Sequence, residues 1–332
     1  SSVWPRTLPA FVLGQTLVCV CISYIVLGSA ARLRERSMSY GAAGAGLGSL
    51  DEKQRTVPNS IAVLDLVAPI AIFAVTMWLL SFNLHYSSPP VPWIMVFLLA
   101  LVPVAFLALA FKARSVGAHT SGWVYAGVMT LLALLAGVVL GDMNYWFNSQ
   151  PFYDIQTMNA YWAVDPSTSH GKQLMDAGRV YFKDTARVDV TKSMGFKNLD
   201  TYCVAPIVSA PNATVIDFWA VGLNCCSSGA TFTCGDVENP IVHAGLRAMR
   251  DEQRPFFRLA VNQAGAEYNI SAPHPLFFYW MGNPSVEVVG YRDQANGLFV
   301  HACMGVSVIN VFTTAIFLTA TAQLAPKKRR GV

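Results

Sequence analysis

Long runs of hydrophobic residues alternate with polar segments along this chain of 332 residues. A helix needs about 20 apolar residues to cross the hydrocarbon core of a bilayer, where no water satisfies free backbone groups. Five stretches meet this requirement: residues 8–30, 61–82, 92–111, 121–141 and 297–322. The pattern therefore predicts an α-helical integral membrane protein with about five transmembrane helices.

The first four predicted spans lie within residues 1–144, and the last belongs to residues 297–332. The stretch 8–30 is longer than the apolar core of a secretory leader, which has about 7–15 residues, so we expect it to remain as a span. Pro69 and Pro103 interrupt the second and third stretches. Proline is tolerated in membrane helices where neighbouring groups satisfy the freed carbonyl, so both are expected to mark kinks.

Lysine and arginine are concentrated in three of the segments outside the spans, and this distribution predicts the direction of each span. The loop 31–60, the turn 112–120 and the C-terminal tail are basic, whereas the loop 83–91 has no basic residue. The basic residues are Arg32, Arg34, Arg36, Lys53, Arg55, Lys112, Arg114, Lys327, Lys328, Arg329 and Arg330. The three basic segments are therefore expected on the cytoplasmic or stromal side, and residues 142–296 on the lumenal or extracellular side.

Residues 145–296 have the composition of a water-soluble domain and are long enough for a core of their own. The segments 202–209 and 214–223 are rich in β-branched and aromatic residues and flank a short turn sequence, which indicates a β-hairpin. The segments 241–250 and 254–268 carry apolar residues at helical spacing. We expect an α+β domain inserted before the last transmembrane helix.

Four of the seven cysteines lie in this domain: Cys203, Cys225, Cys226 and Cys234. An even number of cysteines on the side facing away from the cytoplasm indicates two disulfides. Adjacent cysteines rarely bond to each other, so Cys225 and Cys226 are each expected to pair with Cys203 or Cys234, and two schemes remain open. A zinc site is the weaker alternative, because the spacing lacks a CxxC pair and an oxidising compartment disfavours thiolates. The sequence thus predicts a disulfide-stapled domain and no metal.

Composition agrees with membrane insertion. Hydrophobic residues make up 54% of the chain, charged residues only 13%, and the mean hydropathy is +0.42. A soluble domain carries about 25% charged residues. The net charge of +4 comes mainly from basic clusters at span ends, so it indicates topology and no nucleic-acid partner.

Asn212 and Asn269 each begin an Asn-X-Ser/Thr triplet on the predicted outer side. Such triplets accept N-linked glycans when the protein passes through the secretory pathway. In a plastid lumen they would stay bare.

Polar side chains inside a membrane are costly and point to function or to a partner. Asp65 lies near the cytoplasmic end of the second span, where an ion pair with Arg32, Lys112 or Arg114 is favoured over a proton or cation site. His85 in the loop 83–91 and His301 in the last span have two interpretations. Each is either a ligand for a chlorophyll magnesium or a hydrogen-bonding contact between helices.

Small residues recur at helical spacing on the fourth span, at Ala126, Thr130, Ala133 and Gly137. Small residues let helix backbones approach closely in a membrane. This face is therefore expected to pack laterally against a partner helix.

No catalytic motif is present among the polar residues of the outer domain. Its three histidines and its acids show no HExxH or HxxEH spacing, and there is no GxSxG elbow. We therefore expect no enzyme and name no catalytic residue.

The order of spans and loops resembles that of the tetraspanins with one extra N-terminal helix. As in that family, a large domain with adjacent cysteines lies before the last span. The tetraspanin signature is Cys-Cys-Gly, whereas this chain has Cys225-Cys226-Ser227. The resemblance is one of architecture and carries little functional weight.

Four separated motifs resemble a family of membrane proteins of dinoflagellate algae that has no established activity. They are Asp176–Phe182, Tyr202–Ile207, Asp217–Gly222 and Asn224–Cys226. The likeness covers most of residues 145–296 and the spans. It implies a four-cysteine outer domain, membrane anchoring and a photosynthetic protist as the source.

Together these features predict a non-enzymatic accessory or organising subunit of a larger membrane assembly, such as a thylakoid photosystem or light-harvesting supercomplex. Its partners would be membrane lipids and other membrane-protein subunits, contacted through the spans and the outer domain. Chlorophyll or carotenoid is expected as a cofactor only if the membrane is a thylakoid. A tetraspanin-like organiser of surface or endomembranes is the alternative, and a transporter or channel component is the third hypothesis.

Overall fold

The computed structural model describes residues 59–116, 120–210, 213–226 and 231–324. The chain divides into two compact units. One, the membrane unit, comprises Ser1–Ser149 and Gln294–Val332; the other, the disulfide-bonded domain, comprises Gln150–Asp293. The sequence places this domain at residues 145–296.

Four helices among the described residues are long and apolar enough to cross a membrane. They are Ser60–Ser81, Pro90–Ser115, Ser121–Gln156 and Pro284–Gln323. They correspond to the second to fifth predicted spans. The first predicted span, residues 8–30, lies outside the described residues.

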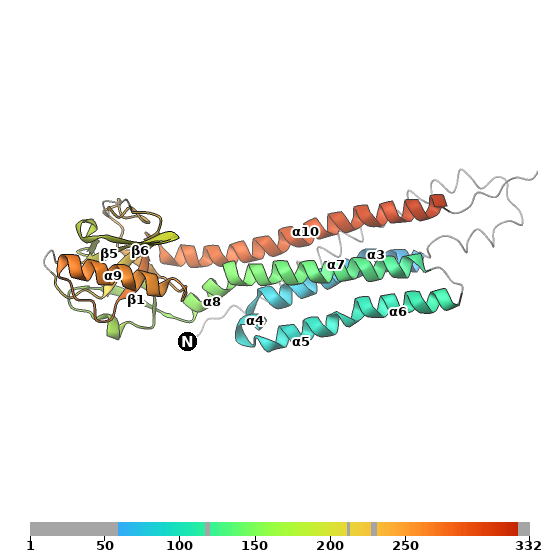
Figure 1. Ribbon diagram of the computed structural model, residues 1–332, viewed down its shortest axis with the longest axis horizontal. Helices are drawn as coiled ribbons and strands as arrows, with labels where there is room; N and C mark the ends of the chain where they lie inside the picture. Colours follow the sequence, from blue (N-terminus) through green and yellow to red (C-terminus); the bar gives the residue numbers. More distant parts are fainter. Residues whose placement is uncertain (1–58, 117–119, 211–212, 227–230, 325–332) are drawn as a thin grey trace, which may run out of the picture. The chain divides into compact units, whose positions relative to one another are not determined.

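The two prolines have different effects on their helices (Figure 1). Helix α3 (Asn59–Ser81) continues through Pro69, whereas the next span is broken at Ala100 into α5 (Pro90–Leu99) and α6 (Leu101–Ser115). A proline ring clashes with the carbonyl four residues earlier, which for Pro103 is that of Leu99. The break therefore lies where Pro103 requires it. A short helix, α4 (Asn83–Ser87), connects α3 to α5.

Helix α7 (Ser121–Asn144) packs closely along α3 because glycines face it. A Cβ atom added to Gly137 would lie 3.0 Å from Thr76 Cβ, and one added to Gly141 would lie 3.2 Å from Met77 Cα. The small-residue face predicted to pack against a partner helix is buried within the chain at Ala126, Thr130, Ala133 and Gly137, and Ala133 and Gly137 lie against α3. Close contact of this kind draws helices together in lipid.

The last helix, α10 (Pro284–Leu324), is longer than predicted and begins at residue 284, not 297. Within the membrane unit it packs on α3 and α7 through an apolar cluster that includes Phe73, Met77, Ala133, Phe299 and Cys303. The amide of Asn144 donates a hydrogen bond to the carbonyl of Ala295, 3.1 Å away. After α7 the chain makes one π-helical turn (Tyr145–Ser149) and enters α8 (Gln150–Gln156).

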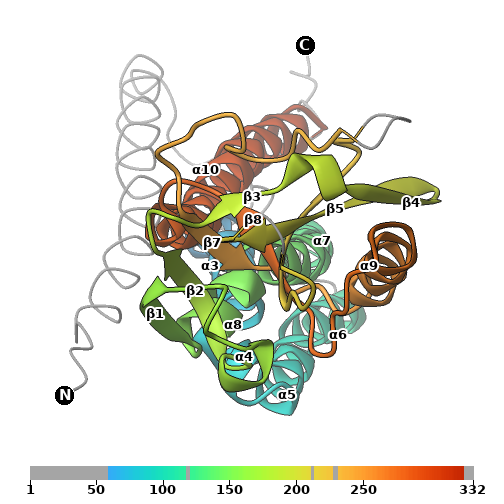
Figure 2. The same cartoon turned by 90° about the vertical axis from the view of Figure 1, so that its left-hand side faces the viewer.

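The disulfide-bonded domain is built on one eight-stranded mixed sheet (Figure 2). The strands follow the order β1-β2-β7-β8-β6-β5-β3, and β4 also pairs with β5. They are β1 (Asn159–Val164), β2 (Ala177–Phe182), β3 (Arg187–Val188), β4 (Met194–Asn198), β5 (Asp200–Val208), β6 (Phe218–Leu223), β7 (Ala244–Arg247) and β8 (Leu276–Trp280). Single turns of 3-10 helix occur at Gly171–Gln173 and Val190–Lys192.

Alternate residues of the central strands supply two apolar cores on opposite faces of the sheet. On one face, Val204, Trp219 and Val221 pack under helix α9 (Arg254–Tyr268), which contributes Phe257 and Ala260. On the other face, a second core contains Phe182, Cys203, Phe218, Phe278 and Trp280. Among the described residues, no long helix contributes to this second core. The loop segment that carries Phe232 and Cys234 contributes instead.

Two of the three secondary-structure predictions for this domain are confirmed. Strands β5 and β6 pair antiparallel, with Tyr202 opposite Leu223, and α9 covers Arg254–Tyr268. The predicted helix at 241–250 is wrong, because residues 244–247 form β7 between β2 and β8. At Gly245 an added Cβ would lie 2.8 Å from Phe278 Cβ, so this strand position requires glycine.

Candidate functional site

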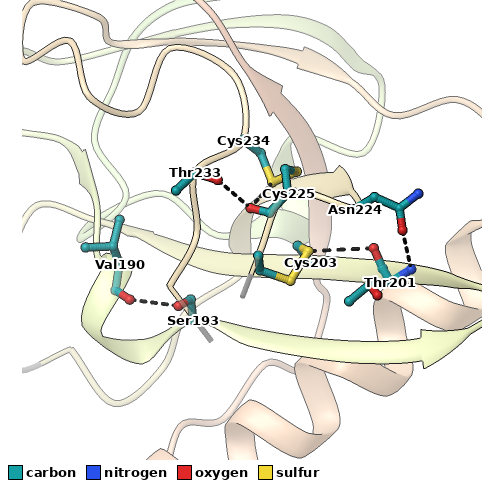
Figure 3. Close-up of a disulfide and its surroundings, with 9 residues drawn as sticks. Val190, Ser193, Thr201, Cys203, Asn224, Cys225, Thr233 and Cys234 are labelled. Atoms are coloured by element: carbon teal, nitrogen blue, oxygen red, sulfur yellow. Dashed lines mark hydrogen bonds between the residues drawn. A yellow bond between two sulfur atoms is a disulfide. The ribbon is translucent and has the colours of Figure 1, made fainter. Parts of the chain in front are cut away.

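The cysteines form two disulfides, Cys203–Cys226 and Cys225–Cys234 (Figure 3). This is one of the two pairing schemes that the sequence leaves open. The antiparallel register places Cys203 of β5 opposite Gly222 of β6, so Cys226, a few residues beyond β6, returns to Cys203. The adjacent cysteines therefore cross-link a strand pair and the following loop.

Two glycines make room for the sulfur atoms. A Cβ atom added to Gly222 would lie 2.5 Å from the sulfur of Cys225, and one added to Gly195 would lie 3.0 Å from that of Cys226. The sulfur atoms of Cys203, Cys225 and Cys234 lie within 4.8 Å of one another, a spacing compatible with a metal site. Because each belongs to a disulfide, the cross-links account for this proximity, and no thiolate is left to bind a metal.

One of the two glycosylation triplets is visible. Asn269 is exposed and ends α9 in a left-handed conformation, with φ 52° and ψ 47°. Asparagine is often found at such helix ends, so this residue also has a local structural role. Asn212 lies outside the described residues.

The two histidines singled out from the sequence have contrasting surroundings. His85 is buried beside Tyr145, with ring centroids 4.1 Å apart, and its Nδ1 lies 2.8 Å from the carbonyl oxygen of Leu80. His301 is exposed on α10, and its Nδ1 lies 2.6 Å from the carbonyl oxygen of Gly297. A carbonyl only accepts hydrogen bonds, so Nδ1 is the protonated nitrogen in both rings and Nε2 is the one with a free lone pair.

Asp65 is fully buried in the membrane unit, and neither of its carboxylate oxygens has a hydrogen-bond partner among the described residues. None of their ion pairs includes it, so the expected pairing with Lys112 or Arg114 is wrong. Both basic residues lie exposed at the end of α6, whereas Asp65 is enclosed by the packing around α3. Arg32 lies outside the described residues.

Asn310 of α10 is a second buried polar residue that is only partly hydrogen-bonded, and it contacts the residue that follows Asp65. Its amide donates to the carbonyl of Leu66, 2.7 Å away, while its own oxygen is buried without a partner. Leu66 directly follows Asp65 on α3. Two buried polar side chains that are not fully hydrogen-bonded, Asp65 and Asn310, therefore lie at neighbouring positions of α3 and α10.

The disulfide-bonded domain contains a pocket of about 200 Å³ lined by three arginines. Arg247 ends β7, Arg254 and Arg258 lie one turn apart at the start of α9, and the remaining wall is formed by Met175 and residues 273–277. His274 lies in this wall, and no acidic residue of the described part of the chain lines the pocket. The lining is therefore cationic.

Arg247 is the most enclosed of the three arginines. Its guanidinium carbon lies 5.6 Å from the centre of the Phe278 ring, and its Nη1 is buried without a hydrogen-bond partner. Burial and, to a smaller extent, the positive charge of Arg254 lower the pKa of Arg247 to about 10. The group still carries its charge at neutral pH, and no described acidic residue forms an ion pair with it.

A buried carboxylate holds the pocket wall in place. Asp217 accepts hydrogen bonds from the backbone N–H groups of Gly171, 2.9 Å away, and His274, 3.1 Å away. The Asp217 carbonyl also accepts from the N–H of Leu276. The segment 273–275 is thereby fixed directly before β8 begins.

These pocket residues are absent from the sequence-based candidates, although a signal exists. Arginines occur at 247, 250, 254 and 258, a density that no other described segment of the domain approaches. The incorrect prediction of a helix over 241–250 gave no reason to expect that Arg247 lies near Arg254 and Arg258. A strand that ends at Arg247 and a helix that starts at Arg254 bring the side chains to one pocket.

No protein-family model, curated protein or solved structure matches this chain.

Proposed function

We propose that this protein is a non-enzymatic accessory or organising subunit of a larger membrane assembly, bound to its neighbours through its spans. The supporting observation is the unequal burial of those spans. In the apolar 18-residue stretch of the Ser60–Ser81 span, 61% is buried within the chain, whereas in that of the Pro90–Ser115 span only 17% is buried. Phe97 and Phe111 are 70% and 75% exposed, so this span offers large apolar side chains to lipids or to another subunit.

The disulfides favour an oxidising lumenal or extracellular compartment for residues 150–293. In the version of the proposal that we favour, the assembly is a photosystem or light-harvesting complex of a thylakoid, and the basic tail is stromal. His301 supports this version, because it is exposed on α10 and its Nε2 has a free lone pair for a chlorophyll magnesium. Carotenoid would be bound by apolar contact alone.

The lateral contact is tested by photo-crosslinking in native membranes. A benzophenone amino acid in place of Phe97 is expected to join the chain to another protein, giving a discrete heavier band. The matched control carries the same group in place of Phe299, which is 1% exposed in the core of the bundle. If position 97 forms only lipid adducts, the proposed subunit contact through this span is wrong. The absorption spectrum of the same preparation in mild detergent reports pigment.

A tetraspanin-like organiser of surface or endomembranes is the second candidate, supported by the exposure of Asn269. A glycan on Asn269, detected as a mass loss after enzymatic deglycosylation and absent from Asn269→Gln, would support this candidate. A bare Asn269 in a pigmented preparation would support the thylakoid version.

Transport is the third candidate, and it depends on Asp65. Asp65 is buried and has no partner among the described residues, and acidic residues inside a membrane are costly and often mark ion pathways or proton relays. Reconstituted vesicles should then lose flux in Asp65→Asn. Flux that is unchanged in this variant would leave the transport hypothesis without its principal residue.

A further inference from the structure

The arginine-lined pocket has no role in the lateral contacts proposed above. All of its lining residues belong to the disulfide-bonded domain. Neither Arg247 nor Arg258 has an ion-pair partner among the described residues, and Arg254 pairs with Asp251, at 2.9 Å, outside the pocket lining. Three positive charges thus converge with one negative charge beside them.

Such an arrangement costs stability unless something neutralises it. Like charges repel each other. A buried polar group without a hydrogen bond loses its hydrogen bonds to water and gains none within the protein. Arg247 bears both costs, since its Nη1 is buried and unpartnered and Arg254 lies close enough to affect its ionisation. An apolar residue on β7 would avoid them. The retained guanidinium therefore has a use that the folded chain alone does not show.

The chemistry of the pocket selects oxyanions. A guanidinium presents N–H donors in a planar fork that matches the oxygen atoms of phosphate or carboxylate. The guanidinium of Arg247 lies over the Phe278 ring, and its Nη1 has no hydrogen-bond partner among the described residues, so it is a donor that such a ligand would satisfy. Asp217 fixes one wall of the pocket, because it accepts a hydrogen bond from the backbone N–H of His274.

Charge and size narrow the choice further. The three arginines carry +3, and Asp251 together with the buried Asp217 behind the pocket wall lowers the sum to +1, so the net charge favours an anion such as a phosphate monoester, whose charge is about −1.5 to −2 at neutral pH. Ligand pockets for whole small molecules have about 300–1,000 Å³, so a pocket of about 200 Å³ suits the charged end of a ligand.

We propose that this pocket binds the phosphate monoester group of a small phosphorylated molecule or of an anionic lipid headgroup. Arg247 is the central ligand, Arg254 and Arg258 contact the outer oxygens, and Asp217 is a positioning residue. The inference is independent of the lateral contacts made by the spans.

The test uses the full chain in phosphatidylcholine nanodiscs at physiological ionic strength. Inorganic phosphate, glycerol 3-phosphate and dihexanoyl phosphatidic acid are titrated separately by calorimetry, with acetate as the monoanionic comparison. Saturable binding is expected for at least one phosphate probe, and weaker binding for acetate. Binding of glycerol 3-phosphate identifies a soluble ligand, whereas binding of the lipid alone identifies a headgroup, and both support the site.

Variants connect the binding to the pocket. Arg247→Met and the pair Arg254→Gln with Arg258→Gln should each weaken binding by about tenfold or more, as expected for lost charge-assisted hydrogen bonds. Arg187→Gln, on the exposed edge strand β3, removes the same charge outside the pocket and should leave affinity unchanged. Unfolding temperatures no lower than that of the unsubstituted protein, together with intact disulfides, exclude loss of the fold in the pocket variants.

Three results would overturn the proposal. They are the absence of saturable binding by any phosphate probe, equal affinity for acetate and phosphate, and equal weakening of binding by Arg187→Gln and Arg247→Met.

Discussion

The membrane unit and the disulfide-bonded domain bring their elements together by different means. In the membrane unit, α7 meets α3 at Gly137 and Gly141, where no side chain separates the helices. In the disulfide-bonded domain, two apolar cores lie on opposite faces of one sheet, and two disulfides close the β5–β6 region. Lipid provides no hydrophobic drive for helix association, so close contact must supply it, whereas water drives apolar faces together.

Glycine is therefore used in both regions, but for different neighbours. Gly137 and Gly141 admit another helix, while Gly222 and Gly195 admit disulfide sulfur atoms. In the membrane unit, Gly137 and Gly141 contact side chains and backbone of α3, a helix that can shift slightly. In the disulfide-bonded domain, Gly222 and Gly195 contact sulfur atoms that a disulfide holds in place, so we expect substitutions of these two glycines to lower the free energy of unfolding more.

Removal of a disulfide is the largest expected effect. Cross-linking limits the unfolded chain more strongly when the closed loop is longer. The separations are 23 residues for Cys203–Cys226 and 9 for Cys225–Cys234. On the chain-entropy relation they contribute about 3.4 and about 2.6 kcal/mol to the free energy of unfolding.

Chemical denaturation of the double variants Cys203→Ser/Cys226→Ser and Cys225→Ser/Cys234→Ser measures these contributions. The first should lose more stability than the second. The opposite order would show that folded-state contacts around Cys225–Cys234 matter more than the length of the loop.

Glycine substitutions compare the two regions directly. Gly222→Ala should reduce the free energy of unfolding by about 2–3 kcal/mol, the upper part of the range for overpacking, because the new methyl group meets two sulfur atoms. Gly137→Ala should cost about 1 kcal/mol, because its closest neighbours lie 3.0–3.2 Å away. Gly305→Ala on α10 meets nothing within 4 Å and is the matched control, with no loss expected. Equal losses at Gly222 and Gly137 would remove the proposed distinction.

Much of this architecture follows from sequence pattern, and the exceptions have physical causes. Helix 254–268 and the β5–β6 pair were predictable because their apolar spacing and composition agree with their burial. Residues 244–247 were not, since alanine, leucine and methionine around them favour a helix while pairing with β2 and β8 imposes a strand. Single-residue propensity carries no information about that pairing.

The candidate site was less predictable than the fold. Four cysteines indicate two disulfides, but only the register of β5 and β6 chooses Cys226 for Cys203. Asp65 and His301 were identifiable because polarity inside an apolar run is conspicuous, whereas His85 was identified in the short loop 83–91. The arginines were not, because surface arginines are common and only the path from β7 to α9 gathers these three.

At Arg247, within the disulfide-bonded domain, we expect stability and ligand binding to respond in opposite directions to one substitution. Replacement by methionine removes an uncompensated buried charge and keeps an apolar contact with Phe278. Because such replacements are often neutral or stabilising, Arg247→Met should raise the free energy of unfolding by about 1 kcal/mol. Thermal unfolding of the ligand-free chain, followed by tryptophan fluorescence, measures this change. A loss of stability would show that the cation–aromatic contact outweighs the cost of the charge.

Acid should have the smallest effect, and in the disulfide-bonded domain it should act through Asp165. Hydrogen bonds from the hydroxyl and backbone N–H of Ser167, with a further contribution from Lys183, hold the pKa of Asp165 well below its usual range. A carboxyl whose pKa is lowered by folding stabilises the folded state above the unfolded-state pKa of about 3.9. That contribution is lost as the pH falls below this value toward the lower folded-state pKa.

Denaturant unfolding of the domain at a series of pH values from about 5 down to about 2 should therefore show a modest decline in stability. Asp165→Asn removes the titrating group and should flatten part of that decline, while Asp184→Asn, an exposed acid nearby in sequence, should leave it unchanged. Identical pH profiles for Asp165→Asn and the unsubstituted protein would assign the acid sensitivity to other carboxyls. Asp176 would then be the next to test, because hydrogen bonds from Asn159 and Tyr161 also lower its pKa.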